Sequence, residues 1–416
     1  MRNARSYWVE TLGCPKNQVD SDKVAGTLAS EGYVRAAGPE DADLVVVNTC
    51  AFIEAARQES VDTVLALADA RAPGARLVVT GCMAERYGDE LAAALPEVDQ
   101  VAGFGVPVTL GPKRPGRPAP LLDLLNLPRP APSAPWAYVK VAEGCDRACG
   151  FCAIPSFRGK QRSRSEASIL AEVEALEAQE IVLVAQDLAS YGRDQGRAGS
   201  IVGLVRSVAS MVPRVRLLYL YPSDLTDALI GAVGDTGIPY FDLSLQHVSK
   251  PLLRRMRRWG DGSRFLRRIA DIRALHPDAA FRSNFIVGYP GETEADHDQL
   301  LGFVEAAQLD WCGFFSYSKE DGTYAAGLDG EVPAGLVAER LGELTERQDQ
   351  ITAARRAALI GSTVEVLVDS AGIGRSHREA PEIDGVIRVP DSLPVGQFAK
   401  VSIVDSEGPD LEAVPA

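Results

Sequence analysis

Hydrophobic and polar positions alternate between two kinds of segment along the first hundred residues. Short β-branched runs, "DLVVVNT" at 43–49 and "RLVVTG" at 76–81, are typical of buried parallel strands. Longer segments at 51–70 and 84–95 follow them and have apolar residues at helical spacing. With a first strand at 6–13, the order is βαβαβα, which predicts an open parallel sheet.

A second alternating region begins after the proline-rich stretch at 106–135. Six strand-like segments separated by helical ones predict a complete or partial (βα) barrel, whose chemistry would lie at the carboxyl ends of the strands. These segments are 137–144, 180–187, 214–220, 240–247, 281–289 and 311–318. After a helical stretch at 337–361, short strands with turn signals predict a small β-barrel.

The chain is therefore expected to be an α/β protein with three domains. We place an N-terminal open-sheet domain at 1–110, a proline-rich linker at 111–134, a partial barrel at 135–358 and a small β-barrel at 361–416. A length of 416 residues fits two or three such domains.

Composition narrows the class of protein. The chain is 46% hydrophobic and 24% charged, as expected of a soluble globular protein, and its net charge of −14 argues against broad nonspecific binding to nucleic acid. Its apolar runs are too short to cross a bilayer, and the start "MRNARSYWVETLG" lacks the apolar stretch of a signal peptide. We expect a cytoplasmic protein without membrane contact.

Seven cysteines point to metal or redox chemistry, because disulfides are rare in a reducing compartment. Cys14, Cys50 and Cys82 each follow a predicted strand of the first domain. Parallel strands end at one edge of a sheet, so these three side chains should converge. Cys312 follows a tryptophan on a late strand and is expected to lie in the core.

The other three cysteines, Cys145, Cys149 and Cys152, are spaced C-x3-C-x2-C in the first loop of the predicted barrel. No fourth cysteine or histidine lies nearby in the sequence. Three thiolates can hold three irons of a four-iron cluster and leave the fourth iron open to a small chelating ligand. A three-cysteine zinc site completed by a remote histidine is the alternative.

This spacing, with Phe151 just before the last cysteine, resembles the signature of the radical S-adenosylmethionine superfamily. The resemblance implies that the amino and carboxylate groups of S-adenosylmethionine fill the open position. In that superfamily an electron from the reduced cluster yields a 5′-deoxyadenosyl radical, which can take hydrogen from an unactivated carbon.

With its three further cysteines, nearly the whole chain resembles the methylthiotransferases. Members have an N-terminal methylthiotransferase domain, a radical domain and a C-terminal TRAM domain. The resemblance implies a second, auxiliary [4Fe-4S] cluster held by Cys14, Cys50 and Cys82, whose open iron carries the sulfur to be inserted.

Local motifs are similar to the RimO-type branch, which methylthiolates an aspartate of the small-subunit ribosomal protein uS12. They are "GCPKN", "NTCAFIEAA", "CAIPSFRG", "VAQDLASYGRD", "FIVGYPGET" and "EAPEIDG". This implies two molecules of S-adenosylmethionine per reaction and an electron donor such as flavodoxin or ferredoxin. Two alternatives are a tRNA adenosine methylthiotransferase and a zinc-stabilised RNA-binding protein without catalysis.

Further candidates lie near predicted strand ends. Arg158 is expected to order the cluster loop or bind a carboxylate. The arginine-rich run at 250–273 is either a solvated helix face or a surface for RNA or an acidic partner. The candidates for contact with the cofactor are Phe151, Gln186, Asp187, Tyr191, Gln246 and an adenine cradle of Ile286, Val287 and Gly288.

The C-terminal domain has an acidic balance. From 361 to 416 there are ten acidic residues and four basic ones. A surface that binds RNA needs lysine and arginine to displace counterions from phosphates. We therefore expect this domain to favour a basic protein and to bind tRNA poorly.

Overall fold

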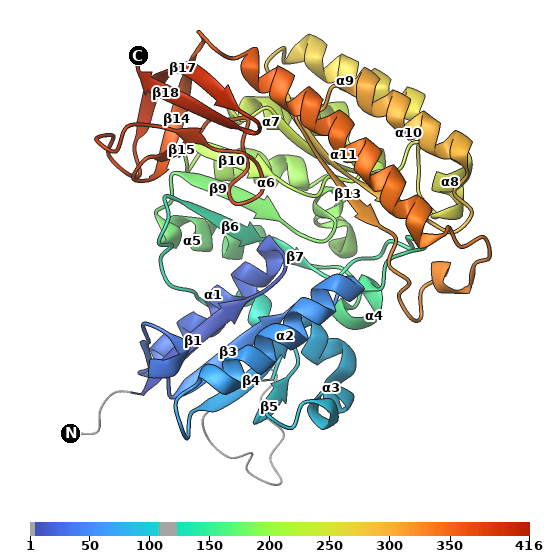
Figure 1. Cartoon of the computed structure of the whole chain (residues 1–416). Coiled ribbons are helices and arrows are strands. Elements are labelled where there is room, and N and C mark those ends of the chain that lie inside the picture. The colour runs from blue at the N-terminus through green and yellow to red at the C-terminus, as the bar shows by residue number, and fades with distance from the viewer. Residues whose placement is uncertain (1–4, 107, 109–122) are drawn as a thin grey trace.

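The structure is a computed structural model that describes residues 5–106, 108 and 123–416. An N-terminal domain lies below a larger central domain, and a small C-terminal barrel packs against the upper part of the central domain (Figure 1). Residues 111–122 of the expected linker lie outside the described residues. Within the described part of the chain, no helix is both long and apolar enough to cross a membrane.

The N-terminal domain is the expected open sheet, with all neighbouring strands parallel. The strand order is β2-β1-β3-β4-β5. The two edge strands, β2 and β5, were not predicted, because segments of two and three residues carry no readable pattern. The strands are β1 Ser6–Thr11, β2 Val34–Arg35, β3 Leu44–Thr49, β4 Arg76–Gly81 and β5 Gln100–Ala102, and the helices are α1 Pro15–Ser30, α2 Glu54–Ala70 and α3 Cys82–Ala94.

The central domain is a partial barrel of six parallel strands in two sheets, as predicted. One sheet has the order β10-β9-β6 and the other β11-β12-β13, and a bridge between Leu220 and Leu243 connects them. The strands are β6 Trp136–Lys140, β9 Glu180–Val184, β10 Arg214–Leu217, β11 Tyr240–Gln246, β12 Ala280–Val287 and β13 Trp311–Ser316.

Helices cover the outer face of this barrel and bury a large aliphatic and aromatic core (Figure 1). A short antiparallel pair, β7 and β8, lies beside the first loop. The elements are α4 Ile154–Arg158, α5 Glu166–Leu176, α6 Ile201–Ala209, α7 Asp227–Asp235, α8 Lys250–Arg255, α9 Gly262–Leu275, α10 Glu294–Ala307, β7 Ala142–Glu143 and β8 Arg162–Ser163.

The C-terminal domain is a closed barrel in the order β14-β15-β16-β18-β17, which confirms the small barrel expected. The long helix α11, Ala334–Ala357, leads into it along the central domain (Figure 1). The last strand was missed, because "DLEAVP" mixes acidic residues with proline. The strands are β14 Thr363–Ser370, β15 Ile373–Arg375, β16 Ile387–Arg388, β17 Phe398–Glu407 and β18 Asp410–Pro415.

The C-terminal barrel is attached by a buried loop that contains the "EAPEIDG" motif. The Tyr138 hydroxyl donates to the carbonyl of Pro381 (2.8 Å), and the Tyr240 hydroxyl donates to Asp384 (2.6 Å). Both tyrosines belong to strands of the partial barrel. The loop therefore packs against strands of the partial barrel and holds the C-terminal domain there.

The N-terminal domain approaches the barrel through α1. Val19 of α1 packs in one apolar cluster with Tyr138 of β6, and Lys140 of β6 forms a buried ion pair with Asp20. The N-terminal part of α1, which follows Cys14, is thus held against the barrel.

Candidate functional site

The structure brings Cys14, Cys50 and Cys82 to the carboxyl edge of the N-terminal sheet. Cys14 caps α1 after β1, Cys50 follows β3, and Cys82 begins α3 after β4. Gly13 packs on the second cysteine, because a Cβ placed on it would lie 3.0 Å from the Cys50 Sγ. Strand ends separated along the sequence thus form a single cluster of thiols.

Asn17 ties the three cysteine loops together. Its Nδ2 donates to the carbonyls of Leu12 (2.8 Å) and Thr49 (3.2 Å), which precede the first and second cysteines. Its Oδ1 lies 3.6 Å from the Cys82 Sγ. One fully buried amide therefore sets the positions of all three loops relative to one another.

Two glycines allow the sharp turns that place these thiols. Gly13 and Gly81 have φ of +93° and +91°, a conformation that L residues rarely adopt. A Cβ on Gly81 would also lie 2.2 Å from the Asn48 side-chain oxygen. The "GC" pairs at the ends of β1 and β4 are thus a requirement of the backbone.

The second triad lies in one loop between β7 and α4. The backbone N–H of Arg147 donates to the Cys145 Sγ (3.4 Å), and the N–H of Cys152 donates to the carbonyl of Cys149 (3.2 Å). The N–H of Gly150 donates to the carbonyl of Met256 (2.8 Å), which fixes the loop to the far side of the barrel. This loop follows the first barrel strand, where (βα) barrels carry their chemistry.

Arg158 connects the two triads. Its Nη2 lies 3.0 Å from the Cys82 Sγ and 2.7 Å from the Asn17 Oδ1. Its Nη1 donates to the Glu143 carboxylate (2.7 Å), and Glu143 immediately precedes Gly144 and Cys145. The sequence led us to expect that Arg158 orders the cluster loop or binds a carboxylate, and in the structure it contacts both triads' loops.

The charges around Glu143 favour its ionised form. Burial alone would raise the pKa of Glu143, but Arg158 and Lys140 hold it well below its usual range. The carboxylate also accepts from the Gln186 side chain (2.9 Å). A buried, charged network therefore fills the space between the two cysteine loops.

The thiols differ in their surroundings. Burial raises the pKa of Cys50 to about 12, of Cys145 to about 11 and of Cys152 to about 12. Cys14 is the exception, because Lys16 and Arg158 outweigh its burial and lower its pKa. Iron would stabilise all the thiolates, since a coordinating thiol is deprotonated by its metal.

Two arginines enclose an aromatic ring beside the second triad. The Arg147 and Arg258 guanidinium carbons each lie 3.9 Å from the centroid of the Tyr221 ring. Arg258 also reaches within 3.4 Å of the Cys149 Sγ. The interpretation of the 250–273 run as a solvated or RNA-facing surface is therefore wrong for Arg258, which points toward the cysteine loop.

Polar atoms without partners lie next to the second triad. The Gln186 Oε1, the Asp187 Oδ1 and the Arg258 Nε are buried and have no hydrogen-bond partner among the described residues. Two acceptors and one donor fit a ligand with amino, hydroxyl and carboxylate groups, as S-adenosylmethionine has. The other Asp187 oxygen accepts from Arg147 (2.6 Å) and so holds the cysteine loop.

The other residues predicted to contact the cofactor have different surroundings in the structure. Tyr191 is buried, and its hydroxyl donates to the carbonyl of Arg164 (2.9 Å). Gln246 ends β11 with φ of +70° and is partly exposed. Phe151 packs against the edge of the barrel core. These three residues stay candidates for the cofactor site.

The expected adenine cradle does not present its side chains together. Ile286 and Val287 are neighbours on β12 and point to opposite faces, because side chains alternate along a strand. Val287 lies in the core beneath the helices, and the space beside Gly288 is filled by Val337, 2.5 Å from where a Cβ would lie. Ile286 alone keeps a partly exposed side chain on the other face.

Across the described residues, no three His, Cys, Asp or Glu side chains form a group that could hold a single metal ion. A four-iron cluster is larger than one ion and needs its three sulfurs farther apart. Cys14 lies within electrostatic range of both Cys50 and Cys82, and Cys152 of both Cys145 and Cys149. Each triad therefore brings three thiols together, as a cluster with three protein ligands requires.

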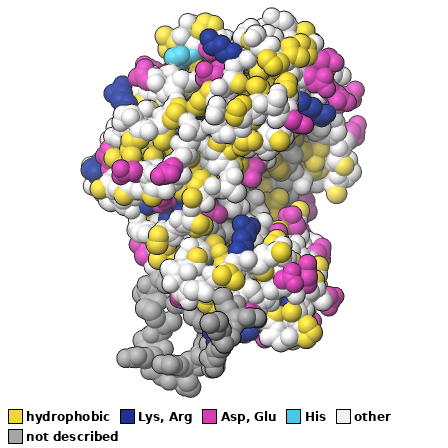
Figure 2. Space-filling model, turned by 90° about the vertical axis from the view of Figure 1, so that its left-hand side faces the viewer, with side chains coloured by type: hydrophobic (Ala, Val, Ile, Leu, Met, Phe, Trp, Pro, Cys, Tyr) yellow, Lys and Arg dark blue, Asp and Glu magenta, His cyan; other side chains and the backbone are white. Residues whose placement is uncertain are grey.

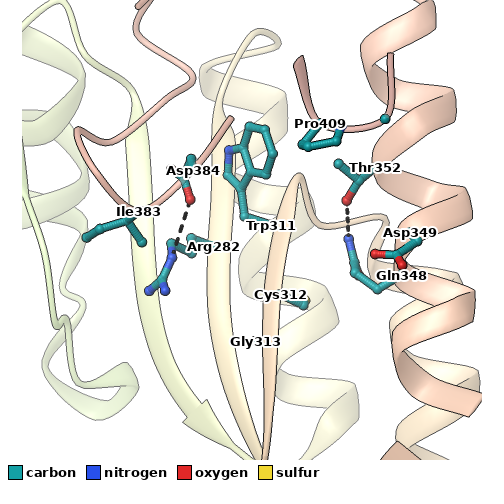
Figure 3. Close-up of a pocket in the computed structure, with 11 residues that line it drawn as sticks. Arg282, Trp311, Cys312, Gly313, Gln348, Asp349, Thr352, Ile383, Asp384 and Pro409 are labelled. Atoms are coloured by element: carbon teal, nitrogen blue, oxygen red, sulfur yellow. Dashed lines mark hydrogen bonds and ion pairs between the residues drawn. The ribbon is translucent and has the colours of Figure 1, made fainter. Parts of the chain in front are cut away.

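A cavity of about 430 Å³ lies elsewhere, at the amino ends of β12 and β13 (Figure 3). Figure 3 shows Arg282 paired with Asp384, and Gln348 donating to Thr352 across the cavity wall. Cys312 lines this cavity and belongs to neither triad. The cavity is at the opposite end of the strands from the cysteine loop.

Comparisons with known proteins assign each domain to a family. Residues 6–103 match the uncharacterized protein family UPF0004, residues 139–304 match the radical SAM superfamily, and residues 360–415 match the TRAM domain. The solved structure of the radical S-adenosylmethionine methyltransferase TsrM from Kitasatospora setae is 14% identical, covers 77% of each chain and has a TM-score of 0.49.

Curated relatives match nearly the entire chain. The ribosomal protein uS12 methylthiotransferase RimO of Kineococcus radiotolerans is 39% identical, covering 99% of this chain and 97% of its own. The RimO proteins of Saccharopolyspora erythraea and Salinispora tropica are 40% and 41% identical, covering 99% and 97% of this chain and 96% and 94% of their own. The resemblance expected from the motifs is confirmed: the chain belongs to the RimO family of radical SAM methylthiotransferases.

Proposed function

We propose that this chain transfers a methylthio group to the β-carbon of an aspartate in the ribosomal protein uS12. Its relatives are named for activity on that protein. The observation that carries the proposal is the Arg158 bridge, which contacts Cys82 of one triad and Glu143 beside the other. A site that both removes hydrogen and inserts sulfur needs its two centres next to each other.

Each triad would hold one [4Fe-4S] cluster with an open iron. Cys145, Cys149 and Cys152 would hold the radical cluster, and Cys14, Cys50 and Cys82 the auxiliary one. When bound, S-adenosylmethionine supplies the radical that takes hydrogen from carbon and the methyl group that joins the sulfur.

The protein's own groups orient and shield these reactants. Gln186 and Asp187 offer free acceptors, and Arg258 offers a free donor beside Cys149. Arg158 and Arg258 place positive charge next to cysteine sulfurs, and hydrogen bonds to sulfur tune the potential of a cluster.

The C-terminal barrel supports a protein target over tRNA. Its exposed residues are more acidic than basic, and two of its four basic residues are turned toward the central domain: Arg375 pairs with Glu180, and Arg378 is only partly exposed. On the face in Figure 2, basic side chains lie apart and form no patch. The exposed acidic residues are Glu365, Glu382, Asp391, Asp405, Glu407 and Glu412, against Arg388 and Lys400.

Purified protein, reconstituted anaerobically with iron and sulfide, tests this function. With S-adenosylmethionine and a reductant such as flavodoxin or ferredoxin, it should methylthiolate uS12 and leave tRNA unmodified. Methylthiolated tRNA adenosine with unmodified uS12 would favour the tRNA enzyme instead. Action on a ribosomal protein also implies that the enzyme works in the cytoplasm.

A further inference from the structure

The first turn of α1 carries a buried cation, Lys16, two residues after Cys14. The residue is 9% exposed, and its Nζ lies 3.3 Å from the centroid of the Tyr219 ring. Tyr219 follows β10 of the central domain. Lys16 therefore reaches from the N-terminal domain to the end of a barrel strand.

Lys16 differs from nearby buried cations in that no carboxylate among the described residues pairs with it. Arg158 and Lys140 both pair with Glu143 and Asp20. No carboxylate of the described residues lies within 4.0 Å of the Lys16 Nζ. An aromatic ring offsets only part of the cost of burying an ammonium, so this site favours an incoming anion.

Lys16 adjoins the auxiliary triad. Lys16 lies within electrostatic range of Cys14, Cys82 and Asp242. Asp242, the barrel carboxylate that interacts with Lys16 electrostatically, is already engaged by Arg282 (3.2 Å) and by the backbone N–H of Tyr219 (2.9 Å). The ammonium therefore remains available to a group that enters between the auxiliary triad and the barrel.

The backbone holds the aromatic partner in an unusual conformation. Tyr219 has φ of +65°, which a bulky residue adopts only when its surroundings impose it. Residues held in such conformations gather at active sites and ligand clamps. The strained turn keeps the Tyr219 ring under the Lys16 ammonium.

We propose that Lys16 binds the side-chain carboxylate of the target aspartate. The inference rests on the proposed function, in which the substrate side chain must enter beside the auxiliary triad. An ion pair there would hold the neighbouring β-carbon close to Cys14 and would distinguish aspartate from asparagine, which carries no charge.

Other cations near the triads are engaged by protein groups, except for Arg258, whose Nε is free beside Cys149 of the second triad. Arg158 is engaged by Glu143, Asn17 and Cys82. Arg147 pairs with Asp187 and Asp224. Lys16 is thus the cation near the auxiliary triad whose charge a substrate carboxylate would neutralise without displacing a protein group.

Peptide binding to the full-length, cluster-reconstituted protein tests the assignment. Two fluorescent peptides would span the target residue of uS12, one with the natural aspartate and one with asparagine in its place. The wild type should bind the aspartate peptide about tenfold more tightly, since truncating one partner of a buried charge pair costs at least that much. Lys16→Met should bind both peptides equally, at the weaker affinity.

The control is Lys250→Met, which removes an exposed lysine at the start of α8 and should keep the preference. Equal binding of both peptides by the wild type would overturn the assignment, whether or not any variant folds. A preference that persists in Lys16→Met, with full iron content, would overturn it too. If wild-type protein methylthiolates uS12 without this preference, only the role of Lys16 fails, whereas an absence of methylthiolation removes the proposed function.

Discussion

Both cysteine triads bring three thiols together, but the backbone places the cysteines differently in each. Cys145, Cys149 and Cys152 lie in one loop, and backbone hydrogen bonds within the loop and to Met256 place them. Cys14, Cys50 and Cys82 come from three strand ends, and their arrangement depends on the sheet register and on Asn17. A local triad can be read from its spacing, whereas a distributed triad exists only once the domain has folded.

The charges around the triads differ as well. Lys16 and Arg158 lower the pKa of Cys14 in spite of burial, while burial dominates at Cys145 and Cys152. Each triad has an arginine beside one of its sulfurs, Arg158 at Cys82 and Arg258 at Cys149, and the buried Lys16 lies next to Cys14 in addition. Under the proposed function, the radical forms at one triad and the substrate is held at the other.

Removing one ligand of the local triad should give the largest effect. Cys149→Ala should abolish formation of 5′-deoxyadenosine, because a cluster that lacks a ligand cannot anchor the cofactor. Chromatography of the reaction products measures this. Cys312→Ala, which changes the cysteine outside both triads, should retain cleavage, and cleavage at the wild-type rate by Cys149→Ala would rule out this loop as the radical site.

Removing the distributed triad should separate the two activities. Wild-type protein should hold about eight irons per chain. The variant with Cys14, Cys50 and Cys82 changed to alanine should keep roughly half of that iron, still cleave S-adenosylmethionine and no longer methylthiolate. Iron analysis with a product assay measures both, and a folded variant that holds no iron would contradict two separate sites.

A change remote from both triads should alter stability alone. Glu180 is fully buried and accepts from Arg216 (2.8 Å) and Arg375 (3.1 Å), which joins the central and C-terminal domains. Glu180→Gln removes the charge partner of the buried Arg216, whereas Arg375 keeps its ion pair with Asp369, and the change should cost about 3 kcal/mol of unfolding free energy. Denaturant titration measures the loss, and unchanged stability would show that the interface does not depend on this ion pair.

The same ion pair predicts a dependence on pH. Burial would raise the pKa of Glu180, but Arg375 and Arg216 lower it from 4.5 to about 2. A depressed carboxyl pKa stabilises the fold above the unfolded value and loses that contribution as pH falls through the folded value. The difference between wild type and Glu180→Gln should therefore be full above pH 4.5 and shrink toward pH 2.

The smallest effect should come from loosening the distributed triad. Asn17→Ala leaves buried carbonyls unpaired and should cost about 1–3 kcal/mol of stability. Iron should be lost from the auxiliary cluster while cleavage of S-adenosylmethionine is retained. Asn126→Ala, at an exposed asparagine, serves as the control. Equal loss of both activities in Asn17→Ala would show that the triads are not independent.

Sequence patterns predicted the structural features that depend on residues close together along the chain. The β-branched runs indicated the central strands of both sheets, and the residues just before Cys14, Cys50 and Cys82 were enough to assign these cysteines to strand ends. Short edge strands such as Val34–Arg35 were not predicted, because pairing with a neighbouring strand defines them more than their own residues do.

Contacts between distant side chains could not be predicted. Arg158 was a candidate, but nothing in its neighbourhood points to Cys82 or Asn17. Arg258 lies in a basic run that predicts a solvated helix and not a contact with the cysteine loop. Lys16 is one residue of "GCPKN", and that motif does not indicate the Tyr219 ring beneath it. Such contacts depend on how the domains pack, which periodicity does not record.

Mass spectrometry of uS12 after reaction tests the central claim most directly. Reconstituted wild-type protein, S-adenosylmethionine and a reductant should add the mass of a methylthio group to a single aspartate of uS12. The variant without Cys14, Cys50 and Cys82 should add nothing while still forming 5′-deoxyadenosine. Unmodified uS12 together with methylthiolated tRNA, or methylthiolation that persists without the distributed triad, would contradict the account.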